Sequence, residues 1–320
     1  MNFAFTSEQL AFAAAVRDVL RDRCDPSERL SCWKELAELG FFGALAPEEA
    51  GGLGLSLIDV VPAIEETGRA AMPGPVVETL VAAPFAGEGV TRVSLLVDGV
   101  ALDADLADLV VDVTGPSAVP VRPEPRRALD PGRQPFGVTV TGEPERLPGS
   151  AEALLRRATV GTAAQLVGVA RQLLARSVGY AKARTQFGRP IGAFQAVKHQ
   201  LADVAIAVEF AAPLVYRAAL SVDALAENAH SVDARGAARA ERSVSADRGV
   251  GVDRDVSAAK AAAGEAAALA ARTALQVHGA IGYTSELDLR FWLARTWSLG
   301  AAYGTSAEHR TRVREAVFGA

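Results

Sequence analysis

The chain has few of the residues that form metal sites and disulfide frameworks. It contains only two cysteines and four histidines in 320 residues, and the histidines show no metal-ligand spacing with the cysteines. Cys24 and Cys32 both lie in the first helical region, near Arg21 and Arg23. We therefore expect ordinary reduced thiols here, rather than a disulfide or a metal site.

The chain also lacks an excess of positive charge and a long apolar run. Its 33 Lys and Arg against 38 Asp and Glu give a net charge of −5, which offers no electrostatic reason to bind nucleic acid. No signal peptide opens the sequence, and no apolar run reaches the about 18 residues of a transmembrane helix. The sequence therefore predicts a soluble cytoplasmic protein that binds neither nucleic acid nor membrane.

Apolar residues make up 50% of the chain. This is enough for a large hydrophobic core spread over two or three domains. Apolar spacing predicts a C-terminal helical bundle with helices near residues 151–182, 193–225, 256–279 and 285–318. Residues 227–256 are charged and contain glycine, and we expect them to form a loosely ordered helix end and connection. The domains expected are a helical domain at residues 1–87, a β domain at 88–150 and the bundle at 151–320.

The most informative segment is Arg184–Gln195, because it places a cation, aromatic rings and an amide in one short connection between two predicted helices. Its glycines and its proline break the helix and let the backbone approach a ligand closely. A solvated charge and ordinary core aromatics would explain any single residue of this set. The functional interpretation therefore depends on further matches that follow in order along the chain.

The segment resembles the R-x-x-F-G-x-x-I-x-x-F-Q signature of the flavin-dependent acyl-CoA dehydrogenases. The resemblance implies that Arg184, Phe187 and Gln195 hold the ADP half of an FAD that is bound mainly by a neighbouring subunit. Gln276–Tyr283 is similar to the family's Q-x-x-G-G-x-G-Y turn, which implies that Gln276 and Gly279 also contact the cofactor. Ala280 replaces the second glycine of that turn.

The N-terminal region resembles the family's helical domain, with Thr6 or Ser7 as the expected N-cap of its first helix. The segments that carry this resemblance are Phe5–Gln9, Trp33–Gly40, Pro47–Gly54 and Glu65–Arg69. Together with the bundle motifs they cover most of the chain. They imply a mainly α fold with a small β middle domain, in which an N-terminal helical domain and a reduced β domain precede a C-terminal four-helix bundle.

The family's catalytic base is absent from its usual position. Family enzymes remove a proton next to the thioester carbonyl with a glutamate just before a Gly-Thr pair. Anchoring on Gly304–Thr305, that position is Tyr303, and anchoring on Arg295 it is Gly304. Neither is a base at neutral pH, because an unperturbed phenol has a pKa of about 10. Thr305 itself matches the family pattern and is expected to contact the cofactor.

Some family members carry the glutamate on an earlier helix, at a position that corresponds to Ala158 or a close neighbour. The residues next to Ala158 are Arg157 and Thr159, so this base is missing too. Glu152 and Glu308 are the nearest carboxylates to the two positions. We do not expect either to act, since a base displaced by about an ångström is severely impaired.

The middle of the chain is too short for the β-barrel with which the family holds the flavin ring. Eight strands and their turns need roughly 80 residues, more than residues 88–150 contain. Strands are predicted at Val93–Val97, Leu109–Val113 and Phe136–Thr141. The Thr-Glu-Pro stretch of the family is absent, and the three tryptophans lie at 33, 292 and 297. This domain is therefore expected not to hold a flavin ring.

Together these features indicate a non-catalytic subunit of a heteromeric, actinobacterial-type acyl-CoA dehydrogenase. The resemblance implies an α2β2 heterotetramer in which FAD is shared across the interface and a full-length partner carries the catalytic glutamate. The partner would bind most of the acyl-CoA, such as a steroid side-chain thioester, and the isolated chain would be inactive.

Two alternatives stay open at this point. The chain could be a self-sufficient homo-oligomeric flavoenzyme of altered chemistry, in which Tyr303 or Glu308 takes part. It could instead be a flavin-free scaffold or interaction protein that keeps only the fold.

Overall fold

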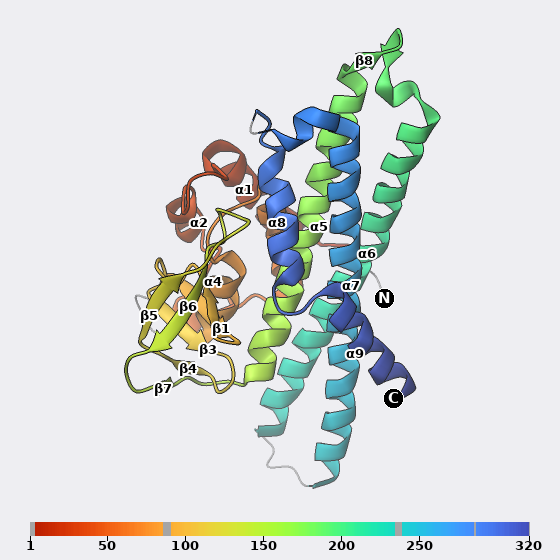
Figure 1. The fold of residues 1–320 in the computed structure, drawn as a ribbon. Coiled ribbons are helices and arrows are strands. Elements are labelled where there is room, and N and C mark those ends of the chain that lie inside the picture. The colour runs from red at the N-terminus through yellow and green to blue at the C-terminus, as the bar shows by residue number, and fades with distance from the viewer. Residues whose placement is uncertain (1–3, 86–90, 234–238, 285, 320) are drawn as a thin grey trace.

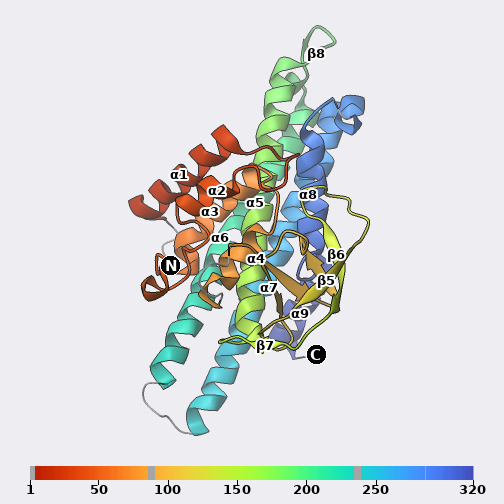
Figure 2. The same ribbon diagram turned by 90° about the vertical axis from the view of Figure 1, so that its left-hand side faces the viewer.

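The computed structural model describes residues 4–85, 91–233, 239–284 and 286–319, and for residues 227–233 and 239–248 it describes the backbone alone. In these residues a long helical bundle forms one side of the molecule. The N-terminal helices and a β-sheet lie next to each other along its other side (Figures 1 and 2). The fold is thus mainly α with a small β region.

The N-terminal region contains four α-helices, of which the first and the third begin with a polar cap. In α1 (Ser7–Arg23) Thr6 is the N-cap, and its hydroxyl and backbone exchange hydrogen bonds with Gln9 in a capping box, an arrangement that satisfies two otherwise unpaired N–H groups. Ser56 and Asp59 do the same for α3. The other elements are α2 (Trp33–Glu38), α3 (Leu57–Arg69), α4 (Val76–Ala82) and the 3₁₀ turns η1 (Glu48–Ala50) and η2 (Ala83–Phe85).

The β region is a seven-stranded sheet in the order β5-β6-β2-β1-β3-β4-β7, with β5 and β7 at its edges. The pair β1–β3 is parallel, and the remaining pairs are antiparallel. The three predicted strands are confirmed, with bounds shifted by at most one residue. The strands are β1 (Val93–Val97), β2 (Val100–Leu102), β3 (Leu109–Asp112), β4 (Ser117–Ala118), β5 (Val121–Pro125), β6 (Pro135–Val140) and β7 (Glu145–Arg146).

The bundle is formed by α5 (Ala151–Ala183), α6 (Gln195–Asp233), α7 (Arg239–His278), α8 (Leu289–Ala301) and α9 (Ser306–Phe318). Two glycines let α3 lie unusually close to α5. A Cβ at Gly168 would lie 1.9 Å from the Glu65 carbonyl oxygen, and one at Gly68 would lie 2.1 Å from that of Gln165. The N-terminal helices are therefore packed directly onto the bundle, and one hydrophobic core runs through both.

Two expectations about the bundle are wrong. Most of 227–256, predicted as a loose connection, belongs to α6 and α7, and residues 234–238 lie outside the described part. Alanine, arginine and glutamate are strong helix formers, and a single helical glycine costs only about 1 kcal/mol. The predicted helix 285–318 is divided into α8 and α9, because Tyr303 (φ 58°) and Gly304 (φ 107°) adopt left-handed backbone conformations. Residue 285 is also outside the described part.

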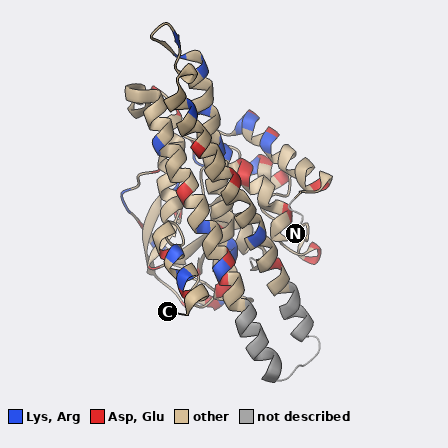
Figure 3. Ribbon diagram, turned by 90° about the vertical axis from the view of Figure 1, so that its right-hand side faces the viewer, with Lys and Arg blue, Asp and Glu red and all other residues tan. Residues whose placement is uncertain are grey.

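One bundle helix combines length with low polarity. Within the described chain, Gln195–Ala226 of α6 is the helix long and apolar enough to cross a membrane, with a mean hydropathy of 1.5. It packs against α5 and α7, so one side of it belongs to the core of the bundle. Charged residues of both signs alternate along the bundle on the side seen in Figure 3, rather than gathering into a patch of one sign.

Candidate functional site

The predicted ADP-binding segment forms a small hairpin at one end of the bundle (Figure 1). Strands β8 (Thr185–Gln186) and β9 (Arg189–Pro190) pair, and the turn residues Phe187 and Gly188 have φ of 53° and 76°. Positive φ at both central residues is the geometry of a two-residue hairpin turn. The short helix η3 (Ile191–Ala193) then leads into α6.

The side chains of this hairpin are presented to solvent. Phe187 is 91% exposed, although a phenylalanine in a left-handed conformation is strained. Its ring meets Phe194 edge-on at 6.1 Å, and the Arg189 guanidinium lies 4.2 Å from the centre of the Phe194 ring. Arg184 and Gln195 are also exposed. The hairpin thus presents a cation, an amide and an aromatic face that none of the described residues covers.

The second predicted motif lies at the same end of the bundle. Tyr180 of α5 and His278 of α7 are in ring contact, with centroids 4.4 Å apart, which joins the helix ends that carry the two motifs. Gln276 is exposed, and Gly279 has a φ of 65° with open space where a side chain would project. Exposed donors, an aromatic ring and accessible backbone fit the ADP part of FAD.

The predicted base position is occupied by a hydroxyl group that is already bonded. Tyr303 donates to Glu78 Oε1 over 2.9 Å, and burial together with the Glu78 charge raises the pKa of Tyr303 well above its usual value. Gly304, the alternative position, has its carbonyl bonded to Lys260. Neither residue of this turn can remove a proton from carbon at neutral pH.

The other candidate positions supply no base either. Ala158 is fully buried in the core. Glu308 is the capping residue of α9: its Oε2 accepts from the Thr305 amide at 2.7 Å and from the Thr305 hydroxyl at 2.9 Å. These bonds lower the pKa of Glu308, and a weaker base results. Glu152 is exposed at the start of α5.

Tyr303 belongs to a group of side chains that we call the buried ionic cluster. The cluster consists of four buried charged residues, Glu78, Asp130, Arg133 and Arg295, together with the neutral Tyr303. Glu78 Oε1 also accepts from Arg133 Nη2 at 3.0 Å, and both side chains are almost completely inaccessible. Arg295 Nε donates to Asp130 Oδ2 at 2.5 Å and, through Nη1, to the Met72 carbonyl. The Glu78–Arg133 pair joins α4 to the loop between β5 and β6. The Asp130–Arg295 pair joins the same loop to α8.

The loop between β5 and β6 is the element that brings two of these charges inward. It reaches from the sheet toward α8 (Figure 1), and Gly74 N donates to the Gly132 carbonyl over 2.8 Å. A Cβ at Gly132 would lie 2.5 Å from Arg295 Nη2, so a larger residue there would displace the Arg295 guanidinium. With this loop in place, the charged side chains beside Tyr303 are paired with one another.

Lys260 and His309 support the same turn from the bundle. Lys260 Nζ donates to the Gly300 carbonyl at 3.1 Å and to the Gly304 carbonyl at 2.8 Å. Burial and the nearby Arg133 charge lower its pKa to about 7. The His309 ring lies 3.0 Å from the Tyr303 carbonyl and 3.1 Å from the Ser257 hydroxyl, and burial lowers its pKa to about 4. His309 is therefore neutral at physiological pH.

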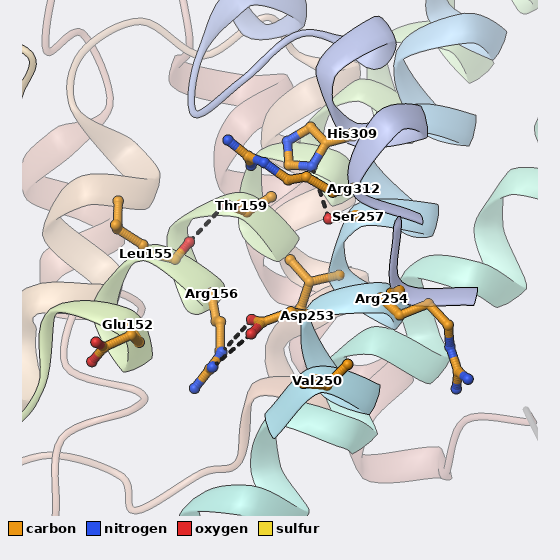
Figure 4. A pocket seen from close by; sticks show the side chains of 12 residues that line it. Glu152, Leu155, Arg156, Thr159, Val250, Asp253, Arg254, Ser257, His309 and Arg312 are labelled. Atoms are coloured by element: carbon orange, nitrogen blue, oxygen red, sulfur yellow. Dashed lines mark hydrogen bonds and ion pairs between the residues drawn. The ribbon is translucent and has the colours of Figure 1, made fainter. Parts of the chain in front are cut away.

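A cleft of about 530 Å³ lies between α5, α7 and α9 (Figure 4). Arg156 and Asp253 face each other in it as a bidentate pair, with contacts of 2.6 and 2.9 Å. His309 and Ser257 also line it. The charges of the Arg156–Asp253 pair are already matched.

The structure therefore brings some predicted site residues together and separates others. Arg184, Phe187, Gln195, Gln276 and Gly279 share one end of the bundle. Tyr303, Gly304 and Thr305 lie in the turn before α9, which is in the other half of the bundle (Figures 1 and 2). The sequence reading missed Glu78, Arg133, Asp130 and Lys260, because no motif relates residues that meet only after folding.

Comparisons with known proteins agree with this arrangement. Residues 150–318 match the model of the acyl-CoA dehydrogenase C-terminal domain, and residues 6–89 match that of the N-terminal domain. The chain belongs to the acyl-CoA dehydrogenase family. It is 31% identical to the acyl-CoA dehydrogenase IpdE2 of Mycobacterium tuberculosis over 287 residues, which span 83% of this chain and 80% of IpdE2.

Two solved structures share the fold. The ChsE4–ChsE5 complex of Mycobacterium tuberculosis gives a TM-score of 0.78 at 21% identity, covering 99% of both chains. The Tcur3481–Tcur3483 "steroid ACAD" G363A variant gives 0.74 at 21% identity, covering 97% of both chains. The fold expected from the resemblance is thereby confirmed.

We predict that the pair Glu78–Arg133 is a major determinant of stability. Arg133→Met leaves the Glu78 charge buried without its cation, which should lower the free energy of unfolding by about 3–5 kcal/mol. The double substitution Glu78→Met/Arg133→Met should recover most of this loss, because it removes both charges. Urea denaturation measures both effects.

The matched control is the exposed pair Arg122–Glu124, whose contact is 3.7 Å. Arg122→Met should change the free energy of unfolding by less than about 1 kcal/mol. If Arg133→Met lowered the free energy of unfolding no more than Arg122→Met does, the cluster would not hold α4, the loop between β5 and β6, and α8 together.

We also predict a specific pH dependence from Lys260, which faces Arg133, Glu308 and His309. Its pKa is about 7 in the folded chain and near the ordinary lysine value of 10.5 in the unfolded chain, so between these pH values the unfolded chain binds the additional proton. Stability should therefore rise with pH, by about 2 kcal/mol from pH 7 to pH 9. The Lys260→Met variant should lack this rise in the free energy of unfolding between pH 7 and pH 9, as measured by urea denaturation. The same rise in the variant would show that Lys260 is not its cause.

Proposed function

We propose that this chain is the non-catalytic subunit of a heteromeric acyl-CoA dehydrogenase. The observation that carries the proposal is that Tyr303, at the family's base position, is bonded to Glu78 inside the buried ionic cluster. A subunit whose base position is closed in this way contributes by binding rather than by proton removal. The full-length partner, in an α2β2 assembly, carries the catalytic glutamate and binds most of the acyl-CoA.

The contribution of this chain is to the ADP half of an FAD shared across the interface. Arg184 would bind the pyrophosphate charge, Gln195 and Gln276 would offer amide groups, and the exposed ring of Phe187 would offer a stacking surface. Gly279, at the same end of the bundle, would leave its backbone accessible to the cofactor. Thr305, in the turn before α9, would contact the cofactor from a different part of the chain. When bound, FAD accepts the hydride that leaves the substrate, and this chain's residues orient it.

Two features support a protein partner. The strained and exposed Phe187 is the kind of backbone outlier that accompanies a binding role. In addition, α6 presents large apolar side chains at four-residue spacing, namely Ile206, Phe210 and Leu214, of which Phe210 is 75% exposed. Such a stripe lies on one face of a helix, and contiguous exposed apolar surface marks interaction sites. A chain of the same fold is the partner proposed, in line with the two-protein complexes among similar structures.

The substrate proposed is a bulky acyl-CoA, such as a steroid side-chain thioester, acted on in the cytoplasm. The description of the similar Tcur3481–Tcur3483 structure as a "steroid ACAD" supports this class. The self-sufficient alternative is disfavoured because Glu308 is committed to the α9 cap and the pKa of Tyr303 is raised.

The test is flavin content, measured by absorbance, with size determined by light scattering. The chain expressed alone should be colourless, and co-expression with its partner should give about one FAD per heterodimer. In the complex, Arg184→Ala should lower FAD affinity roughly ten- to a hundredfold, because hydrogen bonds to charged groups contribute about 1.5–3 kcal/mol. Lys182→Ala, which removes a neighbouring exposed cation outside the motif, should have little effect.

A stoichiometric FAD on the isolated chain would favour the homo-oligomeric flavoenzyme. A stable complex without FAD would favour the scaffold role. Equal FAD affinity in the Arg184→Ala and Lys182→Ala complexes would exclude the proposed cofactor contact.

A further inference from the structure

The cleft between α5, α7 and α9 is lined by both polar and apolar side chains. Ser257 and His309 are polar and almost completely buried, with exposed fractions of 3% and 1%. The apolar part of the lining consists of Leu155, Val250, Val256 and Ala316. Its volume of about 530 Å³ falls within the range of sites for small organic molecules, about 300–1,000 Å³. The cleft therefore suits a molecule with one polar end and an apolar body.

Arg312 supplies this cleft with a positive charge that remains available. Arg156 pairs with Asp253, and Arg254 pairs with Asp255. Within the part of the chain that the structure describes, no residue forms an ion pair or a hydrogen bond with the Arg312 side chain. A guanidinium group without a counter-charge favours an anionic ligand, because hydrogen bonds between charged groups are stronger than those between neutral groups.

Two carboxylates belong to this region, and neither neutralises Arg312. Glu308 lies one helical turn earlier on α9, but its Oε2 accepts from the Thr305 amide and hydroxyl. These bonds lower the pKa of Glu308, and the Arg312 charge adds to the effect without an ion pair. Glu152 is exposed at the start of α5, and Figure 4 shows it on the Arg156 side of the cleft, away from Arg312.

The His309 ring near Arg312 has a defined tautomer. A Cβ at Gly304 would lie 2.9 Å from His309 Nε2 and 3.5 Å from Arg312 Nη1, so both groups approach the same point. His309 Nε2 lies 3.0 Å from the Tyr303 carbonyl, and since a carbonyl only accepts, this nitrogen carries the hydrogen. In the neutral ring Nδ1 then accepts from the Ser257 hydroxyl, over 3.1 Å.

Protonation of His309 would release the Ser257 hydroxyl hydrogen for a ligand. Both ring nitrogens donate in the charged form, so Nδ1–H would bond the Ser257 oxygen and the hydroxyl would be free to donate into the cleft. In the free protein, burial and the charges of Lys260 and Arg312 lower the pKa of His309 to about 4, while Glu308 acts in the opposite direction. An anion next to Arg312 would offset the two cations and raise this pKa.

We propose that this cleft binds a small organic anion with an apolar body, such as a medium-chain carboxylate. Arg312 and Ser257 hold the head group, and Leu155 and Val256 contact the apolar body. His309 takes up a proton as the anion enters and thereby makes the Ser257 hydrogen bond available. The site lies outside the residues assigned to FAD and does not depend on the proposed subunit role.

The experiment measures the binding of octanoate and 1-octanesulfonate to the full chain by isothermal titration calorimetry. Each anion should bind at a single site, and the uncharged 1-octanol should bind more weakly. Arg312→Gln should lower the affinity for octanesulfonate roughly ten- to a hundredfold. The matched control is Arg314→Gln, which removes an exposed cation of the same helix outside the cleft lining and should leave the affinity unchanged.

Nuclear magnetic resonance of the His309 ring nitrogens tests the second part of the head-group site. At about pH 6 the free chain should show the neutral tautomer with hydrogen on Nε2. Saturating octanesulfonate, which stays ionised as the pH is lowered, should shift the protonation midpoint of His309 upward. Ser257→Ala should lower the affinity for octanesulfonate, because one hydrogen bond to the head group is lost.

Four results would overturn the proposal. They are equal affinity for octanesulfonate in the Arg312→Gln and Arg314→Gln variants, binding of 1-octanol as tight as that of the anions, a His309 titration that octanesulfonate leaves unchanged, and an undiminished affinity in Ser257→Ala. Coenzyme A is the additional probe. If it bound more tightly than octanoate, and Arg312→Gln abolished this binding, the cleft would be a nucleotide site instead. Circular dichroism confirms that each variant is folded when tested.

Discussion

The ion pair between Glu78 and Arg133 is the contact that holds together the N-terminal helices, the sheet region and the turn before α9. Both groups are out of water, and a buried charge is tolerated only beside its counter-charge. Because Glu78 belongs to α4 and Arg133 to the loop between β5 and β6, the pair ties the N-terminal helices to the sheet. Tyr303, which lies between α8 and α9, donates a hydrogen bond to the Glu78 carboxylate, so the bundle is connected to the same pair. Asp130 and Arg295 repeat the connection a few residues away, so the three regions meet through charge as well as through apolar packing.

The two ends of the bundle differ in how far their polar groups are already paired. At the turn before α9, hydroxyl, carbonyl and carboxylate groups are already paired with Glu78, Lys260 and Thr305, and none of them is available as a base. At the hairpin end of the bundle the reverse holds. Phe187 stands exposed in a strained conformation, and Arg184, Gln195 and Gln276 are exposed around it. The polar groups at the turn before α9 are therefore bonded within the chain, whereas the side chains at the hairpin end are exposed and can contact another molecule.

Local patterns in the sequence were sufficient for much of the fold. The helix starting at residue 151, the three strands and the Thr6 cap depend on near neighbours, and the resemblance to acyl-CoA dehydrogenases correctly indicated the order of helical, β and helical regions. The break at Tyr303 was missed because a non-glycine residue with positive φ has no sequence signal, and the turn is held by Lys260 from another helix. The helical conformation of residues 227–233 and 239–256 differs from the prediction because the many charged residues and glycines there are typical of connections, whereas their neighbours have high helix propensity. The pairing of Glu78 with Arg133 depends on residues 55 positions apart, which no periodicity relates.

The most direct test of the central claim restores the missing base. In a complex whose partner has lost its own catalytic glutamate, Tyr303→Glu or Gly304→Glu is introduced into this chain, and turnover is measured alongside FAD content to confirm assembly. A base alone contributes only about 10² to 10⁴-fold, and a new carboxylate beside Glu78 would take up a proton rather than ionise. We expect FAD to remain bound and turnover to stay absent. Recovery of a substantial fraction of the original activity would show that this subunit retains a complete but disarmed active site, and the division between binding and catalysis would be wrong.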